Sequence, residues 1–182
     1  QFIASWANLV YSTPQLKDCE PYSVIASAFV AASLDMPIDK NLGYAFIIPY
    51  NDRKSGKKLA QFQMGYKGYI QLALRTGQYA LLNYTEVLKG EIKSANKLTG
   101  EIVFQETTLE AAPVIGYAAY LKLTSGFEKT AYMTVEKIKA HGAEYSPGYK
   151  RDDSKWKTDF PAMALKTVIK QLLTKWGVMS IE

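Results

Sequence analysis

The spacing of apolar residues divides the chain into predicted helices and strands. Residues 2–10 repeat at helical spacing, and so do residues 21–36, which open on Pro21, a residue that is well tolerated at a first helical position. The second segment is apolar nearly all round, so we predict that this helix is buried. Residues 43–50 and 59–64 have strand-like composition and flank a longer loop, which predicts a β-hairpin.

Residues 61–79, QFQMGYKGYIQLALRTGQY, pass from the period of a strand to that of a helix. Gly65 and Gly68 permit a tight turn between the two elements. In the helix that follows, Lys67 and Arg75 lie on a basic stripe that is separate from the apolar face. Basic residues beside aromatic ones suit a phosphate backbone with bases stacked next to it, although a solvated helix face explains the same pattern.

Four further strand-like segments follow, and the short turns between them predict an antiparallel meander. These segments are residues 79–89, 101–105, 114–124 and 127–133. A short helix is predicted to start at Thr134 and to end at His141-Gly142, where His141 would have a simple capping role.

The strongest helical pattern covers residues 159–176. Its apolar stripe consists of Leu165, Ile169, Leu172 and Trp176. Lys166 and Lys170 lie one turn apart on a different face. Helices before, within and after the strands predict an α+β fold, in which an antiparallel sheet, made of the meander and the N-terminal hairpin, packs against a few helices. At 182 residues the chain is predicted to form a single domain, residues 1–182.

The net charge of +5 and the pI near 9.1 permit a polyanionic partner without requiring one. Residues 51–58, NDRKSGKK, place four basic residues at the tip of the predicted hairpin. Residues 146–158, SPGYKRDDSKWKT, interleave basic residues with Tyr149 and Trp156. Both segments suit single-stranded nucleic acid. The alternatives are a charged loop that keeps the protein soluble and a surface loop whose Trp packs inward.

Most enzyme signatures are missing from the sequence. It contains no Walker-type phosphate loop and no G-x-G-x-x-G fingerprint. His141 is the only histidine, which excludes a two-histidine metal site, and Cys19 has acidic neighbours that disfavour a reactive thiolate. A lone cysteine fits a reducing cytoplasm, and the sequence opens on no signal peptide and has no apolar run of membrane length. We therefore expect a protein that needs no cofactor and no metal and is not an enzyme.

One enzymatic alternative stays open. Glu91-Ile92-Lys93 has the Glu-x-Lys spacing of many metal-dependent nucleases, and further metal ligands would come from Asp52, Asp152 and Asp153. A tripeptide of this kind is common by chance. A metal-dependent nuclease or another DNA-processing enzyme is therefore the alternative function, and a generic RNA-binding or structural oligomer is a third.

Three segments in this order resemble the signature segments of one family. They are AFVAASLDMPIDKNLGYAFIIPY, FQMGYKGYIQLALRTGQY and SPGYKRDDSKWKTDFPAMALKTVIKQLLTKWG. On these segments the chain resembles the RecT family of phage single-strand annealing proteins, the Redβ-like recombinases, over nearly its whole length. The resemblance implies ATP-independent binding of single-stranded DNA and annealing of complementary strands in phage homologous recombination, by an oligomeric ring or helical filament.

The resemblance also implies the partners of the chain: single-stranded DNA, the annealed duplex and further copies of the same chain. A phage exonuclease or a host single-strand-binding protein would be contacted through a further C-terminal region, before which this chain is expected to stop. No membrane partner is expected, and the expected location is the cytoplasm of the bacterial host. Because the chain begins at Gln1, we expect it to be a trimmed or ordered fragment.

The candidate DNA-binding residues fall into three sets. The groove is predicted to consist of Lys67, Arg75, Lys122, Lys150, Arg151, Lys155, Lys166 and Lys170. A basic hairpin finger, laid on duplex or on the neighbouring protomer, would contain Arg53, Lys54, Lys57 and Lys58. The candidate base contacts, each of which also fits a core position, are Tyr66, Tyr69, Tyr149 and Trp156.

Overall fold

The computed structural model describes residues 2–39, 41–146 and 148–180, which belong to two compact units. The N-terminal unit comprises Gln1–Arg75 and Met179–Glu182, and the second unit comprises Thr76–Val178. The antiparallel sheets and the C-terminal helix confirm the predicted α+β class. The assignment of residues 1–182 to one domain stays a prediction.

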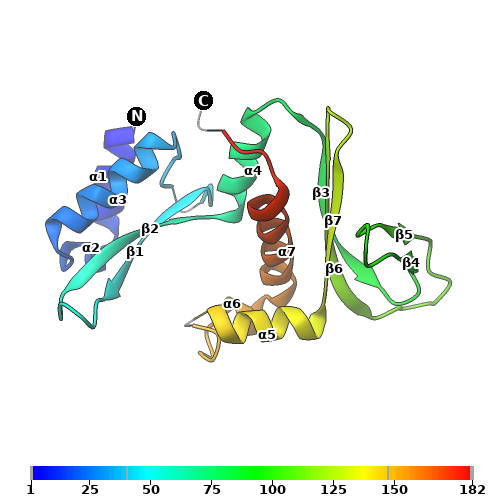
Figure 1. The fold of residues 1–182 in the computed structure, drawn as a ribbon. Coiled ribbons are helices and arrows are strands. Elements are labelled where there is room, and N and C mark those ends of the chain that lie inside the picture. The colour runs from blue at the N-terminus through cyan, green and yellow to red at the C-terminus, as the bar shows by residue number, and fades with distance from the viewer. Residues whose placement is uncertain (1, 40, 147, 181–182) are drawn as a thin grey trace. The chain divides into compact units, whose positions relative to one another are not determined.

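The N-terminal unit consists of helices around a two-stranded hairpin (Figure 1). Its elements are α1 (Phe2–Ser12), α2 (Pro14–Lys17), α3 (Pro21–Ser33), β1 (Ala45–Asn51), β2 (Lys58–Met64) and α4 (Tyr66–Arg75). β1 and β2 pair antiparallel from Ala45↔Met64 to Asn51↔Lys58, which confirms the predicted hairpin. Leu16, Met36 and Ile38 are among the fully buried side chains of this unit.

Two serines fix α3 on the hairpin. The Ser27 hydroxyl donates to the carbonyl oxygen of Ala60 at 3.2 Å, and the Ala60 N–H donates to the Ser23 hydroxyl oxygen at 2.9 Å. Only the face of α3 that meets β2 is buried. The prediction of a fully buried helix is therefore wrong, since Tyr22 is 76% exposed and Phe29 is 70% exposed. A hairpin of two strands covers only one side of a helix, and sequence periodicity alone does not reveal how much cover is available.

The second unit is built on a three-stranded antiparallel sheet of order β3-β6-β7 (Figure 1). Its elements are β3 (Tyr79–Leu88), β4 (Ile92–Ala95), β5 (Ile102–Phe104), β6 (Val114–Leu123), β7 (Glu128–Thr134), α5 (Val135–Tyr145), α6 (Lys155–Thr158) and α7 (Phe160–Trp176). β4 and β5 form a hairpin of their own, so β3 pairs with β6 rather than with the next strand in the chain. β4 was not predicted, because it has only four residues and three of them are exposed.

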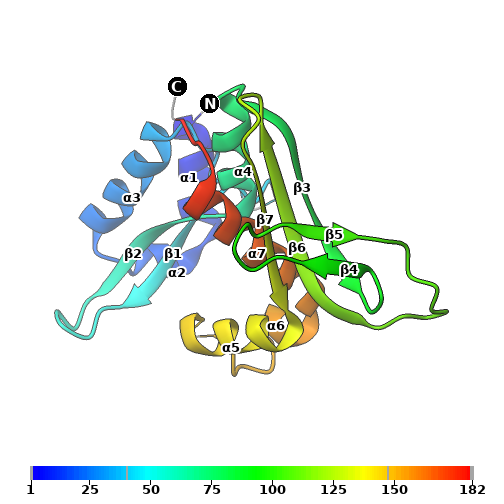
Figure 2. The same ribbon diagram turned by 45° about the vertical axis from the view of Figure 1, so that its right-hand side comes forward.

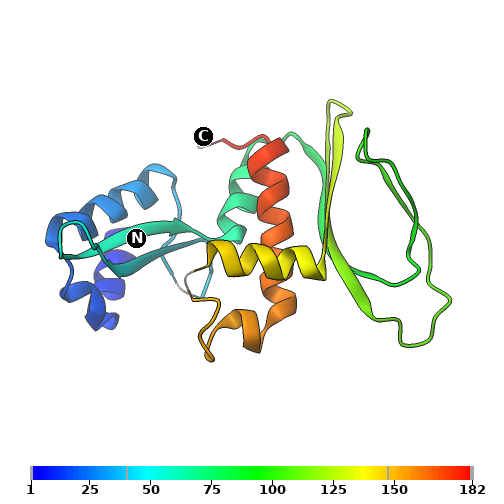
Figure 3. The ribbon, with the colours of Figure 1, turned by 60° about the horizontal axis from the view of Figure 1, so that its bottom comes forward.

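Different elements cover the two faces of this sheet. α7 packs on one face, against β6, β7 and β3. The β4–β5 hairpin lies over the opposite face (Figure 1 and Figure 3). Ile169 and Leu172 are fully buried, as predicted for the α7 stripe, but Trp176 is 48% exposed. The buried face of α7 is turned toward Ala164, Val168 and Leu173, so the predicted stripe lies along one side of it.

α5 is longer than the sequence predicted. It continues through His141 and Gly142 to Tyr145, and its final N–H bond is made by Ser146 to the carbonyl oxygen of Gly142. Capping by His141 is therefore wrong; its Nδ1 lies 3.4 Å from Nε2 of Gln171 on α7. Glycine is needed at position 142 because the loop after α5 packs closely against the helix there: a Cβ would lie 2.8 Å from the Tyr149 ring.

Candidate nucleic-acid interface

α7 is the most strongly basic helix of the second unit. Its 17 residues include three lysines, at 166, 170 and 175, and no acidic residue. The sequence pointed to Lys166 and Lys170 through their spacing of four. It missed Lys175, whose charge, together with that of Lys170, contributes to the lowered pKa of His141. Burial is the first cause of that shift, and Glu144 opposes it.

Lys166 has the most unusual electrostatic environment of these lysines. Its side chain projects from α7 and is half-buried, and the resulting loss of hydration, followed by the positive charge of Lys170, lowers the pKa of the Lys166 ammonium. Among the described residues no carboxylate forms an ion pair with Lys166. A buried cation without a counterion costs free energy. An anion that reached Lys166 and Lys170 would therefore be bound favourably.

Residues 148–158 combine ion pairs with exposed cations. The guanidinium of Arg151 grips Asp153 with bonds of 2.9 and 2.6 Å, and Lys157 lies 2.6 Å from Asp152. The Asp153 partner raises the pKa of Arg151, first through the hydrogen bond and then through its charge. Arg151 is thus engaged within the loop, whereas Lys150 and Lys155 are exposed.

The two aromatic residues of this loop pack against the helices. The rings of Tyr149 and Trp156 lie 5.5 Å apart, and Trp156 lies 6.3 Å from Phe160. Trp156 is buried and Tyr149 is half-buried. Trp156 thus packs inward, as in the alternative interpretation of this loop. Its ring packs against Gly142 of α5 and Phe160 of α7, and contact with a base would require the ring to leave this packing.

Lys122 is the outlying member of the predicted groove. It lies on β6 and its Nζ is 3.5 Å from a carboxylate oxygen of Glu128 on β7. The same carboxylate accepts a 2.6 Å bond from the Tyr120 hydroxyl, and that bond is the first cause of the lowered pKa of Glu128. Lys122 is therefore partly neutralised by its cross-strand neighbour.

In the N-terminal unit, β1 and β2 are joined by a long loop at the tip of the hairpin (Figure 2). Three cations of this tip are exposed. They are Arg53, Lys54 and Lys57. Asp52 organises the tip by accepting bonds from the Ser55 N–H at 3.0 Å and the Ser55 hydroxyl at 2.6 Å. The hydroxyl bond is the first cause of the lowered pKa of Asp52. Lys58, the fourth predicted member, is drawn away to Asp18 at 3.2 Å.

α4 carries the basic stripe that the sequence predicted, but its two cations differ in their surroundings. Lys67 is exposed in the first turn. Arg75, in the last turn, donates to the carbonyl oxygens of Leu34 at 2.9 Å and Asp35 at 2.8 Å. Arg75 therefore holds the end of α3, whereas Lys67 faces solvent.

Close backbone contacts explain the two glycines at the start of α4. A Cβ at Gly65 would collide with the carbonyl oxygen of Gly43, and a Cβ at Gly68 would collide with that of Tyr44. The Gly65 N–H also donates to the Tyr44 carbonyl oxygen at 2.9 Å. The helix can enter beside β1 only because these positions lack side chains. Tyr66 and Tyr69, which lie between and after the glycines, are half-buried.

Comparison with known proteins identifies the family of a chain with these features. The family model described as "RecT family" matches residues 1–182. This chain belongs to the RecT family. Among its curated relatives, "Uncharacterized protein YqaK" of Bacillus subtilis (strain 168) is 50% identical over 182 residues, which are 100% of this chain and 61% of the relative. "Protein RecT" of Escherichia coli (strain K12) is 30% identical over 176 residues, which are 95% of this chain and 64% of the relative.

This RecT-family chain thus spans less than two thirds of the length of these relatives. The family match confirms the resemblance drawn from the three sequence segments. The DNA contacts of individual residues stay predictions, and the structure adds which of these side chains already have intrachain partners.

The carboxylates named for the nuclease alternative have other partners in this RecT-family chain. Within residues 2–39, 41–146 and 148–180, no three His, Cys, Asp or Glu side chains gather closely enough to hold a metal ion. A carboxylate oxygen of Glu91 accepts a 2.7 Å bond from the Leu88 N–H in a strand-end turn, and Asp152 and Asp153 are paired with neighbouring cations. As for membranes, none of the described helices is both long and apolar enough to cross one.

Proposed function

We propose that this chain binds single-stranded DNA and anneals it to a complementary strand without ATP, as one subunit of a homo-oligomeric ring or filament that acts in phage recombination. The observation that carries the proposal is the environment of Lys166: a half-buried ammonium, with no carboxylate partner among the described residues, on a helix that has three lysines and no acidic residue. A phosphate is the anion that best compensates such a site in a RecT-family protein.

The mechanism follows from what annealing requires. The protein must hold one strand by its phosphates and leave the base edges free for the second strand. Lysine contacts to phosphate give affinity without sequence preference, which suits a protein that accepts any complementary pair. In this proposal Lys166 and Lys170 bind the backbone, and the exposed Lys150 and Lys155 extend the same contact.

The exposed cations of the N-terminal unit have a second role in this proposal. Lys67 contacts the strand, and the hairpin tip with Arg53, Lys54 and Lys57 contacts duplex or a neighbouring protomer. Arg75, Lys58 and Arg151 contribute less, because each is engaged by partners within its own unit. The chain acts in the cytoplasm of the bacterial host, where a phage exonuclease or a host single-strand-binding protein is a further partner.

An annealing assay tests this function. Two complementary oligonucleotides, one of them fluorescently labelled, are mixed with the chain in the absence of ATP and in the presence of EDTA. We expect duplex to form faster than without protein, while strand length stays unchanged on a denaturing gel. Shortened strands that require added Mg²⁺ would instead support the nuclease. Binding of RNA and DNA with equal affinity, without faster pairing, would support a generic RNA-binding protein.

A further inference from the structure

The exposed face of α3 is unusual for a surface helix. The helix Pro21–Ser33, PYSVIASAFVAAS, contains no charged residue. Its large apolar side chains outside the core are Tyr22, Ile25, Phe29 and Val30, all of which are exposed. Positions 22, 25 and 29 lie on one face at helical spacing, and Val30 lies beside them. We call these four residues the α3 ridge.

The ridge is held outward by the opposite face of the helix. Val24, Ala28 and Ala31 are buried, and Ser23 and Ser27 are hydrogen-bonded to Ala60 of β2. The helix cannot rotate to bury Tyr22 and Phe29 without breaking both bonds. Exposed apolar patches of this kind mark contact sites for other molecules.

The chemistry of the ridge decides which molecule it contacts. Single-stranded DNA is held through Lys and Arg, and α3 has neither. Helices that lie on membranes carry Lys or Arg on the polar face, which α3 also lacks. The partner that fits an uncharged apolar ridge is therefore a protein surface that is apolar and concave.

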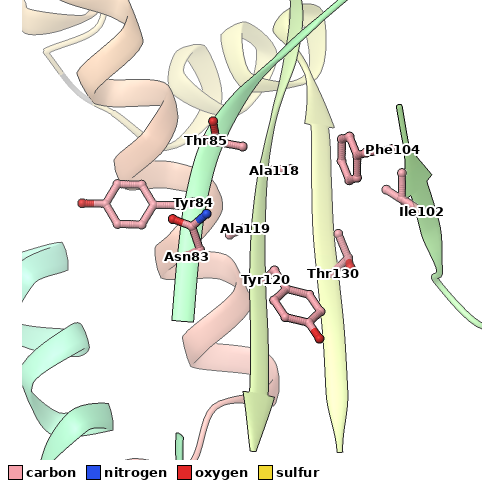
Figure 4. Close-up of a pocket in the computed structure, with 9 residues that line it drawn as sticks. All are labelled: Asn83, Tyr84, Thr85, Ile102, Phe104, Ala118, Ala119, Tyr120 and Thr130. Carbon is pink, nitrogen blue, oxygen red and sulfur yellow. The ribbon is translucent and has the colours of Figure 1, made fainter. Parts of the chain in front are cut away.

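The second unit of the same chain has such a surface. A pocket of about 310 Å³ lies between the outer face of the sheet and the β4–β5 hairpin (Figure 4). Its apolar lining includes Ile102 and Phe104 of β5, which face the sheet, and Ala118 of β6. Phe104 is 43% exposed. A volume of about 300 Å³ is at the lower end for small-ligand pockets and accommodates an aromatic side chain.

The charges around this pocket disfavour DNA. An adjoining hollow shares Ile102, Tyr120 and Thr130 with the pocket and is lined by Glu101 and Glu128. The cations near these carboxylates are already engaged: Lys122 pairs with Glu128, and Lys129 donates to the Thr99 carbonyl oxygen at 3.2 Å. A neutral apolar ridge therefore fits this region better than a phosphate backbone.

We propose that the α3 ridge of one copy of the chain docks in the β5–β6 pocket of a second copy, with Phe29 as the inserted side chain. Ridge and pocket are different surfaces, so the contact is heterologous and leaves one ridge and one pocket unfilled in every dimer. Such a contact repeats to give a ring or a filament. Aromatic side chains bury about 150–250 Å² each, so this contact provides a large part of the roughly 1,000 Å² of a specific interface.

This inference rests on the proposed function and specifies the contact between subunits of its homo-oligomer. The test uses no DNA, so the subunit contact and the proposed DNA annealing can fail separately. The first measurement is sedimentation velocity of a Tyr22→Gln, Phe29→Gln variant. We expect its apparent dissociation constant for self-association to rise at least tenfold. The control is Tyr11→Gln, since Tyr11 is 80% exposed on α1 and lies outside the ridge. An unchanged mass distribution in the ridge variant, with its circular dichroism intact, would overturn the proposal.

Disulfide trapping identifies the two surfaces directly. One preparation carries Phe29→Cys and the other carries Phe104→Cys; the native Cys19 is buried and its pKa is raised by that burial, so it stays unreactive. Under mild oxidation we expect cross-linked dimers when the two preparations are mixed, and few in either alone. Efficient cross-linking of Phe29→Cys with itself would show that α3 meets α3, and would overturn the pairing of ridge with pocket.

Discussion

Arg75 donates a 2.9 Å hydrogen bond to the carbonyl oxygen of Leu34, the residue that caps α3. A second bond of 2.8 Å reaches the carbonyl oxygen of Asp35, whose positive φ of 47° turns the chain away from the helix. The last carbonyl groups of a helix lack partners within the helix. Arg75 supplies two charged donors at this point, so the last residue of α4 secures the end of α3.

Replacement of Arg75 by Ala is expected to lower the free energy of unfolding by about 1.5–3 kcal/mol, the usual value for hydrogen bonds to charged groups. Chemical denaturation measures this loss. Lys67→Ala is the matched control on the same helix, and it should change stability by less than about 0.5 kcal/mol because Lys67 is exposed. DNA affinity should fall more for Lys67→Ala than for Arg75→Ala. A larger loss of DNA affinity in Arg75→Ala would indicate that Arg75 contacts the DNA.

Ile169→Ala is expected to destabilise the chain by about 2–5 kcal/mol, because the side chain is fully buried between α7 and the sheet. Thermal or chemical unfolding monitored by circular dichroism gives the value. Leu98→Ala serves as the control, since Leu98 is 93% exposed in the same unit and should change stability by less than about 0.5 kcal/mol. Equal effects of the two substitutions would contradict the placement of α7.

The double variant Lys166→Ala, Lys170→Ala tests the phosphate contacts on α7. We expect a folded protein that anneals poorly and whose affinity for single-stranded DNA depends less steeply on salt. The slope of log affinity against log salt should fall by about one for each lysine removed. A Lys137→Ala, Lys139→Ala variant on α5 removes the same charge as a control. If both double variants lose the same slope, the effect comes from net charge rather than from a site on α7.

Lys166→Met is expected to stabilise the chain at neutral pH, because it removes a partly buried charge and keeps an apolar stem of similar length. The pKa of Lys166 is lower in the folded chain than in the unfolded one, so between these two values the unfolded chain binds more protons and stability rises with pH. The gain from Lys166→Met should therefore shrink as pH rises toward the ordinary lysine pKa of about 10.4.

Unfolding free energies of both proteins across this pH range test the prediction, and the difference between them removes the contribution of tyrosines that titrate in the same window. A gain that stays constant with pH would mean that Lys166 is as well solvated in the folded chain as in the unfolded one. Nuclear magnetic resonance titration of the Lys166 side chain adds a second test. Its pKa should rise when single-stranded DNA binds, because a phosphate stabilises the charged form.

Gly142→Ala is expected to destabilise the second unit by about 1–3 kcal/mol, the usual cost of overpacking. The new Cβ would lie 2.8 Å from the ring of Tyr149 and 2.9 Å from that of Trp156. Gly148→Ala is the matched control, because its nearest neighbour beyond the adjacent residues is an Arg151 side-chain carbon at 4.0 Å. Near-ultraviolet circular dichroism should report displaced aromatic rings only for Gly142→Ala. A stabilising effect, as expected for Ala in an open helix, would show that the loop does not pack there.

Local sequence patterns determined most of the elements of this protein. The change of period at Gly65 located β2 and α4, and the spacing of Ile169 and Leu172 located α7 and part of its buried face. Such patterns are reliable because helices and strands repeat within a few residues. The family was also accessible from sequence, since three ordered segments carry the resemblance that the family model confirms.

Tertiary structure alone decided which groups meet. β3 pairs with β6, and Arg75 contacts Leu34, although these residues lie far apart in the sequence. The sequence also does not indicate that the Lys166 side chain is partly buried. The same holds for α3, whose apolar outer face stays exposed because only a two-stranded hairpin covers it. Periodicity indicates that a face is apolar or charged. Whether that face is covered, paired or left for a partner depends on long-range packing, which no local pattern contains.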